Sequence, residues 1–194
     1  MFQIIKSIVK NLQNSLYVFM LRKSIILSNH VYINGRILLS GTKNIKIGNH
    51  VYINSNEKSN PIGGNIRCYF KTLRDGIIII DDGSRLSNVA ITSFSKVYIG
   101  KNVYIGGGSK IYDTDFHSLD YQERINGGGK ELSVQSAPIQ IFDGVFIGAQ
   151  TIILKGVTIG EKSIIGAGSV VTKDIPPGEI WAGNPARFIR KIIE

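Results

Sequence analysis

The sequence predicts an all-β solenoid, a parallel β-helix in which short strands stack coil upon coil. Between residues 141 and 171 an aliphatic residue recurs every six positions, at Ile141, Ile147, Ile153, Ile159, Ile165 and Val171. Neither an α-helix nor an ordinary strand has a period of six, so the repeat belongs to one side of a larger coil. Gly148, Gly160 and Gly166 each follow an aliphatic marker. A glycine there lets the chain turn a corner, through a positive φ or a close approach.

The same repeat begins near residue 29. Asn29–Asn34 reads Asn-His-Val-Tyr-Ile-Asn and returns letter for letter as Asn49–Asn54. Related forms follow at Val97–Gly100, Val103–Gly106 and Val145–Gly148. Each unit predicts a short strand rich in Val, Ile and Tyr that is closed by a Gly or Asn corner. We therefore expect one hexapeptide-repeat β-helix over residues 28–178.

Two flanking segments complete the predicted organisation. Residues 1–27 are apolar and basic and predict an N-terminal helix that caps the solenoid, with an interfacial membrane helix as the alternative. Pro176 and Pro177 end the repeat, because consecutive prolines cannot continue a ladder. Residues 179–194 are expected to form a tail and a short basic helix from Ala186 to Glu194, whose apolar face is Phe188, Ile189 and Ile192.

Two stretches interrupt the repeat. Residues 55–76 contain Pro61, Gly63, Gly64 and scattered Lys and Arg, and residues 112–138 are polar with Gly127-Gly128-Gly129 in their middle. Neither stretch has the six-residue pattern, so both are expected to protrude as loops without secondary structure of their own. Long loops in a compact fold are usually functional.

Composition limits the choice of partner and compartment. The 194 residues are 43% hydrophobic and carry a net charge of +9, which fits one folded domain with an anionic partner. A nucleotide-like cofactor, a nucleic acid and a membrane surface are all anionic. No apolar run approaches the roughly 20 residues that span a bilayer. The single cysteine, Cys68, fits a reducing compartment and is expected to be a buried small residue rather than a nucleophile.

Three histidines are the candidates for general acid–base chemistry. His30 and His50 occupy equivalent corner positions of the duplicated repeat, which favours a structural surface role. His117 lies where the repeat stops, among carboxylates, and its ordinary pKa suits a general base. There are two alternatives for His117. It is an ordinary hydrogen-bonded loop histidine, or it binds a metal together with Asp113 and Asp115.

Taken together, the motifs resemble the hexapeptide-repeat acyltransferases of the left-handed β-helix class, especially maltose and galactoside O-acetyltransferases and relatives from surface-polysaccharide gene clusters. The resemblance covers residues 81–192. It is carried by Ile99–Val103, Asp115-Phe116-His117, Ile147-Gly148-Ala149, Ile165–Pro176 and Ala182–Arg187.

This resemblance implies a role for several residues. His117 matches the catalytic base, and Asn88 matches an asparagine that faces the same site. Ala149 matches a residue whose backbone N–H holds the thioester carbonyl and its oxyanion. The remaining cofactor matches are Ala167, Thr172 and Lys173 in the pantetheine groove and Arg187 and Arg190 near the CoA phosphates. Asp115 and Arg124 are expected to contact the acceptor.

The resemblance therefore implies acetyl-CoA-dependent transfer to a sugar hydroxyl of a capsular polysaccharide or lipopolysaccharide, without a metal, in a cytoplasmic homotrimer. The sequence shows neither aromatic residues interleaved on a basic face nor a known nucleic-acid recognition motif, so nucleic-acid binding is not expected. The alternatives are N-acetylation of a nucleotide-linked amino sugar, a zinc lyase resembling the γ-class carbonic anhydrases, and a scaffold without catalysis. The inner face of the membrane is the alternative location, reached through the N-terminal helix.

Overall fold

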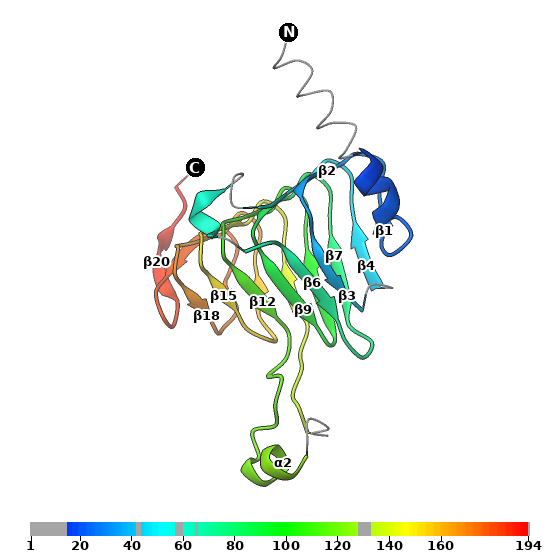
Figure 1. Cartoon of the computed structure of the whole chain (residues 1–194). Coiled ribbons are helices and arrows are strands. Elements are labelled where there is room, and N and C mark those ends of the chain that lie inside the picture. Colours follow the sequence, from blue (N-terminus) through cyan, green and yellow to red (C-terminus); the bar gives the residue numbers. More distant parts are fainter. Residues whose placement is uncertain (1–14, 42–43, 57–59, 65, 128–132, 194) are drawn as a thin grey trace.

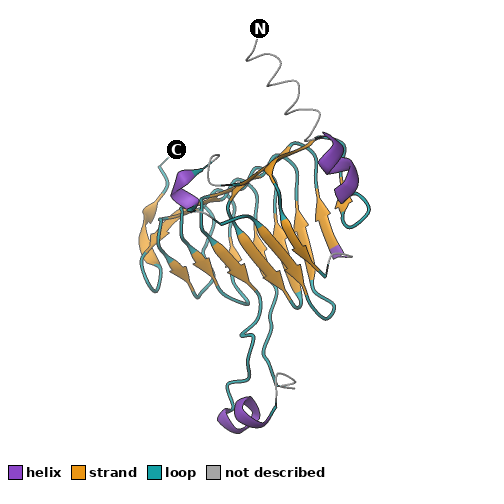
Figure 2. Cartoon of the chain, in the orientation of Figure 1, coloured by secondary structure: helices purple, strands orange, loops and turns teal. Residues whose placement is uncertain are grey.

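The computed structural model describes residues 15–41, 44–56, 60–64, 66–127 and 133–193. The coils stack into a left-handed β-helix with a mostly parallel sheet along each of its three sides (Figures 1 and 2). Sheet A contains β1 (Ile26–Leu27), β4 (Ile45–Ile47), β7 (Ile77–Ile80), β10 (Lys96–Ile99), β13 (Ile139–Ile141) and β16 (Thr158–Ile159). The predicted solenoid is confirmed.

The other two sheets follow the same stacking order. Sheet B contains β2 (Val31–Gly35), β5 (Val51–Ser55), β8 (Arg85–Ser87), β11 (Tyr104–Ile105), β14 (Phe146–Ile147), β17 (Ile164–Ile165), β19 (Glu179–Ala182) and β20 (Arg187–Lys191). Sheet C contains β3 (Leu38–Ser40), β6 (Tyr69–Thr72), β9 (Ala90–Ser93), β12 (Lys110–Tyr112), β15 (Ile152–Ile153) and β18 (Val170–Val171).

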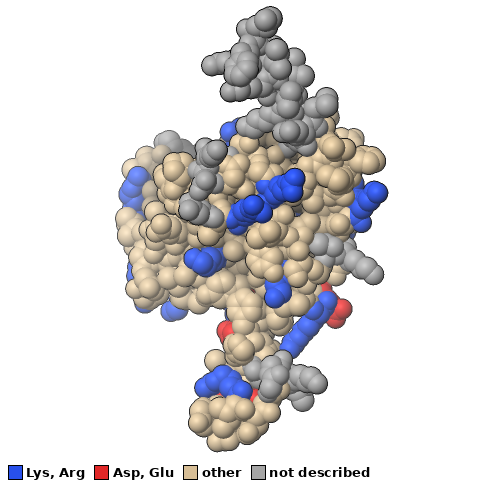
Figure 3. Space-filling view, in the orientation of Figure 1, with Lys and Arg blue, Asp and Glu red and all other residues tan. Residues whose placement is uncertain are grey.

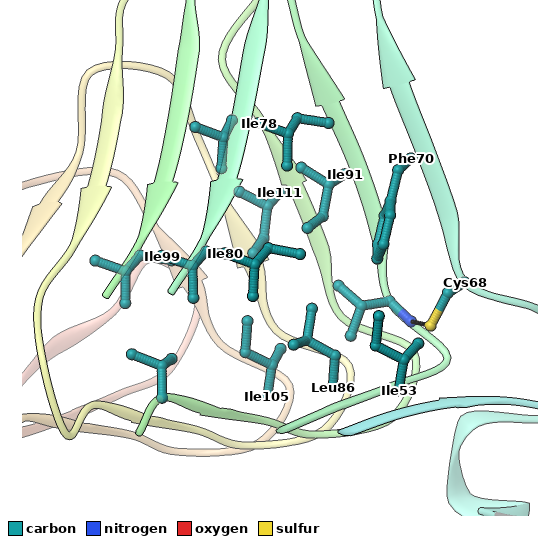
Figure 4. Close-up of a cluster of buried hydrophobic side chains, with 14 of the residues drawn as sticks. Ile53, Cys68, Phe70, Ile78, Ile80, Leu86, Ile91, Ile99, Ile105 and Ile111 are labelled. Atoms are coloured by element: carbon teal, nitrogen blue, oxygen red, sulfur yellow. Dashed lines mark hydrogen bonds between the residues drawn. The ribbon is translucent and has the colours of Figure 1, made fainter. Parts of the chain in front are cut away.

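The six-residue period now has a structural meaning, because consecutive markers belong to sheets A, B and C in turn. The register between strands places each of these aliphatic residues directly above the equivalent residue of the previous coil. Three columns of aliphatic side chains therefore fill the interior of the solenoid. The column in sheet B, for example, is Ile53, Leu86, Ile105, Ile147 and Ile165. All five are buried, and Figure 4 shows three of them packed beside Ile78, Ile80 and Ile99.

The glycines after the markers serve close approach rather than a positive φ. A Cβ on Gly106 would lie 2.5 Å from the backbone nitrogen of Ala149 in the next coil. The left-handed residue comes two positions later in the corner, as at Gly108 (φ 80°), Gln150 (φ 60°) and Gly168 (φ 71°). The corner therefore needs glycine directly after the aliphatic residue, where a side chain would have no space. Two positions later, where φ is positive, it accepts glutamine as well as glycine.

An α-helix covers the N-terminal end of the solenoid over described residues 15–21. The predicted helix over residues 1–27 is wrong at its C-terminal end, because Ile26–Leu27 form β1 and pair with β4. Val18 and Leu21 are each 8% exposed and join the core. The Tyr17 hydroxyl accepts from the backbone N–H of Ile37 at 2.9 Å and donates to its carbonyl at 3.3 Å. Residues 1–14 of the predicted helix lie outside the described part of the chain.

The first predicted loop is shorter than expected. Residues 69–72 form β6, whose inward side chains are Phe70 and Thr72. An aromatic and a hydroxyl residue replace the usual Ile or Val there, so the sequence pattern missed a strand that the solenoid completes. The remaining segment contains a 3-10 helix, η2 (Pro61–Gly63), capped by Asn60. The expectation of a loop without secondary structure is wrong for this stretch.

The second predicted loop is confirmed as a protrusion, but it also has structure of its own. It leaves the solenoid after β12, carries the helix α2 (Tyr121–Asn126) and returns before β13 (Figure 1). Its stem is paired through a bridge between Thr114 and Ser136. We call residues 113–138 the arm.

The predicted C-terminal helix is wrong. Residues 187–191 form β20, which pairs antiparallel with β19 and places Phe188 opposite Trp181. The rings of these two residues meet edge to face, with centroids 6.4 Å apart. Pairing with the end of sheet B therefore decides the conformation of a segment whose own pattern favoured a helix.

Candidate active site

One edge of the solenoid, where sheet B turns into sheet C, presents a row of backbone corners that we call the glycine edge. Its corners are 87–89, 106–108, 148–150 and 166–168. The N–H of Gln150 donates to the carbonyl of Gly107, and that of Gly168 donates to the carbonyl of Ala149. Ala149 and Ala167 thus occupy equivalent positions in successive coils, and Gly106 and Gly148, which carry no Cβ, leave the backbone nitrogens of Ala149 and Ala167 sterically uncovered.

The arm leaves from a different edge, between sheets C and A, which we call the loop edge. His117 lies in the stem of the arm and its side chain is exposed. The preceding residue, Phe116, has a φ of 64° and packs against Tyr112 and Phe94, with centroids 5.5 and 6.1 Å away. This aromatic cluster fixes the direction in which the stem carries His117.

Asp113 anchors the arm at its base. Its carboxylate is fully buried and accepts three hydrogen bonds, from Ser93 Oγ (2.8 Å), Phe94 N (2.7 Å) and Ser95 N (2.9 Å). These donors all belong to the corner of the preceding coil. Both carboxylate oxygens are therefore engaged in holding the fold. Within the described residues no group of three His, Cys, Asp or Glu side chains is placed to hold a metal ion.

Asp115 and Arg124, the predicted acceptor contacts, both make bonds within this region. Lys155 Nζ lies 2.6 Å from Asp115 Oδ1 and ties the stem to the solenoid. Arg124 is exposed, and its Nη1 donates to the carbonyl of Ser118 at 2.7 Å. The ion pair with Lys155 joins residues 40 positions apart, so no local sequence signal indicated it.

The predicted cofactor residues divide between the two edges. Ala149 and Ala167 lie on the glycine edge, and Arg187 pairs with Ala182 at its C-terminal end, next to Gly166. Arg190 follows on the same exposed strand. Thr172 and Lys173 are exposed on the loop edge, across β18 from Ala167.

Asn88 lies at the glycine edge beneath the segment that carries η2. Its side chain is fully buried, and its Nδ2 donates to the carbonyl of Ile66. Gly63 packs directly on it, since a Cβ on Gly63 would lie 2.6 Å from Asn88 Cβ. In a single chain Asn88 therefore contacts this covering segment rather than solvent.

Two buried side-chain atoms in the described part of the chain have no hydrogen-bond partner, Asn88 Oδ1 and Asp115 Oδ2. Both belong to residues that the sequence assigned to the site, and they lie on different edges. Buried polar atoms are rarely left unpaired in folded proteins. Asn88 Oδ1 lies beneath the covering segment, and Asp115 Oδ2 lies in the stem beside Lys155.

The other candidate residues have structural surroundings. The His30 and His50 rings are exposed and stack at 5.1 Å on the edge between sheets A and B, away from His117. Cys68 is fully buried, as predicted, and burial raises the pKa of its thiol to about 11. A thiol that stays protonated is a poor nucleophile.

Comparison with known proteins agrees with this geometry. Residues 138–173 match the family of bacterial transferase hexapeptide repeats. Galactoside O-acetyltransferase of Escherichia coli is 44% identical over 105 residues, which cover 54% of this chain and 49% of that protein. The chain spans about half the length of the curated relatives it matches.

Solved structures extend the likeness to most of the chain. A hexapeptide-repeat acetyltransferase of Vibrio cholerae, solved with acetyl-CoA, is 28% identical, with a TM-score of 0.61 over 89% of this chain and 74% of that one. A maltose O-acetyltransferase of Clostridium difficile is 29% identical, with a TM-score of 0.54 over 90% and 73%. The chain is thus a hexapeptide-repeat β-helix that resembles the maltose and galactoside O-acetyltransferases, and its residues 138–173 match the bacterial transferase hexapeptide family.

Proposed function

We propose that the chain is an acetyl-CoA-dependent O-acetyltransferase that acts on a sugar hydroxyl, in the cytoplasm, during synthesis of a capsular polysaccharide or lipopolysaccharide. The observation that carries the proposal is the glycine edge. It aligns Ala149, Ala167 and the arginine strand β20 in one row, in a fold for which a relative was solved with acetyl-CoA.

Along this row the cofactor would meet two kinds of group. The N–H of Ala149 is the donor for the thioester oxygen, and an oriented backbone donor of this kind stabilises the negative charge that develops there. Arg187 and Arg190 supply forked cationic donors for the phosphates. Thr172 and Lys173, on the loop edge, border the pantetheine arm that is held on the glycine edge of a neighbouring copy.

His117 is the proposed base. Its imidazole removes the proton of the acceptor hydroxyl while the hydroxyl oxygen attacks the thioester carbonyl carbon. The carbon–sulfur bond then breaks, and the proton passes to the CoA sulfur. Transfer is direct, so Cys68 takes no part.

The site forms between copies of the chain in a homotrimer. His117 is on the loop edge and Ala149 is on the glycine edge, with sheet C between them. The unpaired Asp115 Oδ2 and Asn88 Oδ1 lie on these same two edges. In a ring of copies, the loop edge of one chain meets the glycine edge of the next. Asn88 then acts as a positioning residue, which holds the covering segment at Ile66.

Calorimetric titration with acetyl-CoA tests the first step. We expect binding by the wild-type chain and a marked loss in the double variant Arg187→Glu and Arg190→Glu. The matched control, Lys101→Glu and Lys162→Glu, reverses two exposed charges on the edge between sheets A and B, away from the proposed groove, and should bind normally. No heat of binding to the wild-type chain would contradict the proposal. Acceptor screening with sugars and amino sugars then separates O-acetylation from N-acetylation.

A further inference from the structure

The helix over residues 15–21 has apolar side chains on two opposite faces. Val18 and Leu21 face the solenoid. Leu16, Phe19 and Met20 are 61%, 63% and 51% exposed, and their spacing places them together on the outer face. A helix that is apolar on both faces is normally buried on both.

Basic residues border this outer face. Arg22 and Lys23 follow it directly, and Arg22 Nη2 donates to the carbonyl of Ser28, which holds it at the start of the first coil. On the adjoining sheet A, Ile26 is 56% exposed and pairs in register with exposed Lys46. We call these residues the N-terminal patch: Leu16, Phe19, Met20, Arg22, Lys23, Ile26 and Lys46.

The N-terminal part of the sequence carries charge of one sign only. Residues 1–56 contain no Asp or Glu, and their seven basic residues are Lys6, Lys10, Arg22, Lys23, Arg36, Lys43 and Lys46. The 14 acidic residues of the chain all come later. On the face shown in Figure 3, Lys and Arg cover more of the surface than Asp and Glu, and most of the face is neither. The N-terminal end of the solenoid is therefore a cationic surface with an exposed apolar helix face.

A hollow of about 280 Å³ lies between the helix and the first strand of sheet B. Phe19, Arg22, His30 and Tyr32 are among the residues that line it. It combines an apolar rim with cationic and hydrogen-bonding groups. This combination suits a phosphate headgroup whose acyl chains lie against Phe19.

We propose that the N-terminal patch docks the protein on an anionic lipid membrane. An amphipathic helix with apolar side chains toward the bilayer and basic residues at its border is the usual interfacial anchor. No helix in the described part of the chain could span a membrane. A second copy is a poorer occupant, because two cationic ends repel each other. Nucleic acid would leave the apolar face uncovered.

Vesicle co-sedimentation of the full chain tests the proposal. We expect the protein to sediment with vesicles of phosphatidylcholine and phosphatidylglycerol, to remain in solution with phosphatidylcholine alone, and to be released by salt. The variant Arg22→Gln with Lys23→Gln should partition on the order of twenty-fold more weakly, since each basic residue near an anionic surface contributes to binding. The variant Leu16→Gln with Phe19→Gln should also bind vesicles more weakly, because it removes apolar surface that would be buried in the membrane.

The controls separate docking from unfolding. Ile193→Gln removes an apolar side chain that is 86% exposed at the other end of the chain, and Lys101→Gln with Lys110→Gln removes two charges; neither should alter sedimentation. The patch variants should bind acetyl-CoA in solution like the wild type, so this test is independent of the proposed chemistry. Failure of the wild type to sediment, or equal losses in the controls, would overturn the proposal. If light scattering shows that the patch variants differ from the wild type in molar mass, the patch is a contact between copies of the chain. If the wild type binds RNA and the patch variants do not, the patch is a nucleic-acid site.

Discussion

His117 is exposed on a stem that is fixed by its neighbours, which is what a general base needs in order to meet a substrate in a constant geometry. We expect His117→Ala to lower kcat by about two to four orders of magnitude, because general-base catalysis typically contributes that much. The dissociation constant for acetyl-CoA should not change. His50→Ala is the matched control, since His50 is also exposed but stacks on His30 at another edge, and it should retain full activity. Wild-type turnover by His117→Ala would exclude the mechanism.

Cys68 gives a second prediction for a single side chain. Burial raises the pKa of its thiol from 9.0 to about 11, so native protein at pH 8 should resist iodoacetamide and react only after denaturation, as measured by mass spectrometry. The unfolded thiol ionises at lower pH than the folded one. Its contribution to the free energy of unfolding is therefore complete below pH 9 and falls between about pH 9 and 11. Cys68→Ala should keep transferase activity. Fast alkylation of the native chain would show that the thiol is accessible.

Among the elements, the segment over the glycine edge depends on one glycine. A Cβ on Gly63 would press on Asn88, and the Gly63 backbone already lies against Gly107. We expect Gly63→Ala to lift this segment, so that trypsin cleaves after exposed Arg67 on the order of tenfold faster. Ile62→Ala, which shortens a side chain that is 67% exposed, is the control and should be cleaved at the wild-type rate. Equal cleavage of both variants would show that the contact does not hold the segment.

The elements also show how far the sequence could lead. Ile and Val markers at a period of six predicted the solenoid, because each marker fills one inner column. The strand β6 was not predicted, because Phe70 stands where the repeat usually has Ile or Val. Phe188 and Ile189 suggested a helix where the chain forms β20. In both cases the deciding contact is with a strand distant in sequence or with the solenoid interior. The motif around His117 predicted a site residue, whereas its support by Lys155 through Asp115 required the fold.

For the whole molecule, the arm determines how a complete site can form. It projects away from its own solenoid (Figure 1), and its base is fixed by Asp113 and Lys155. With the base of the arm held there, His117 in the stem lies at the loop edge, and sheet C separates it from the glycine edge of the same chain. A monomer would therefore hold the base and the acyl-binding row apart, and we expect light scattering to show a trimer. A chain that is active as a monomer would contradict the shared site.

Mixed oligomers provide the sharper test of the shared site. His117→Ala lacks the base, and Arg187→Glu with Arg190→Glu lacks the proposed phosphate contacts, so each variant alone should be inactive. When the two are unfolded together and refolded in equal amounts, a trimer places an intact His117 from one variant against intact arginines from the other in about a quarter of its interfaces. Activity should then recover to roughly that fraction of wild type, whereas mixing folded trimers without exchange should recover none. If His117 and the arginines acted within one chain, no mixture would regain activity, because every chain would still lack one of them.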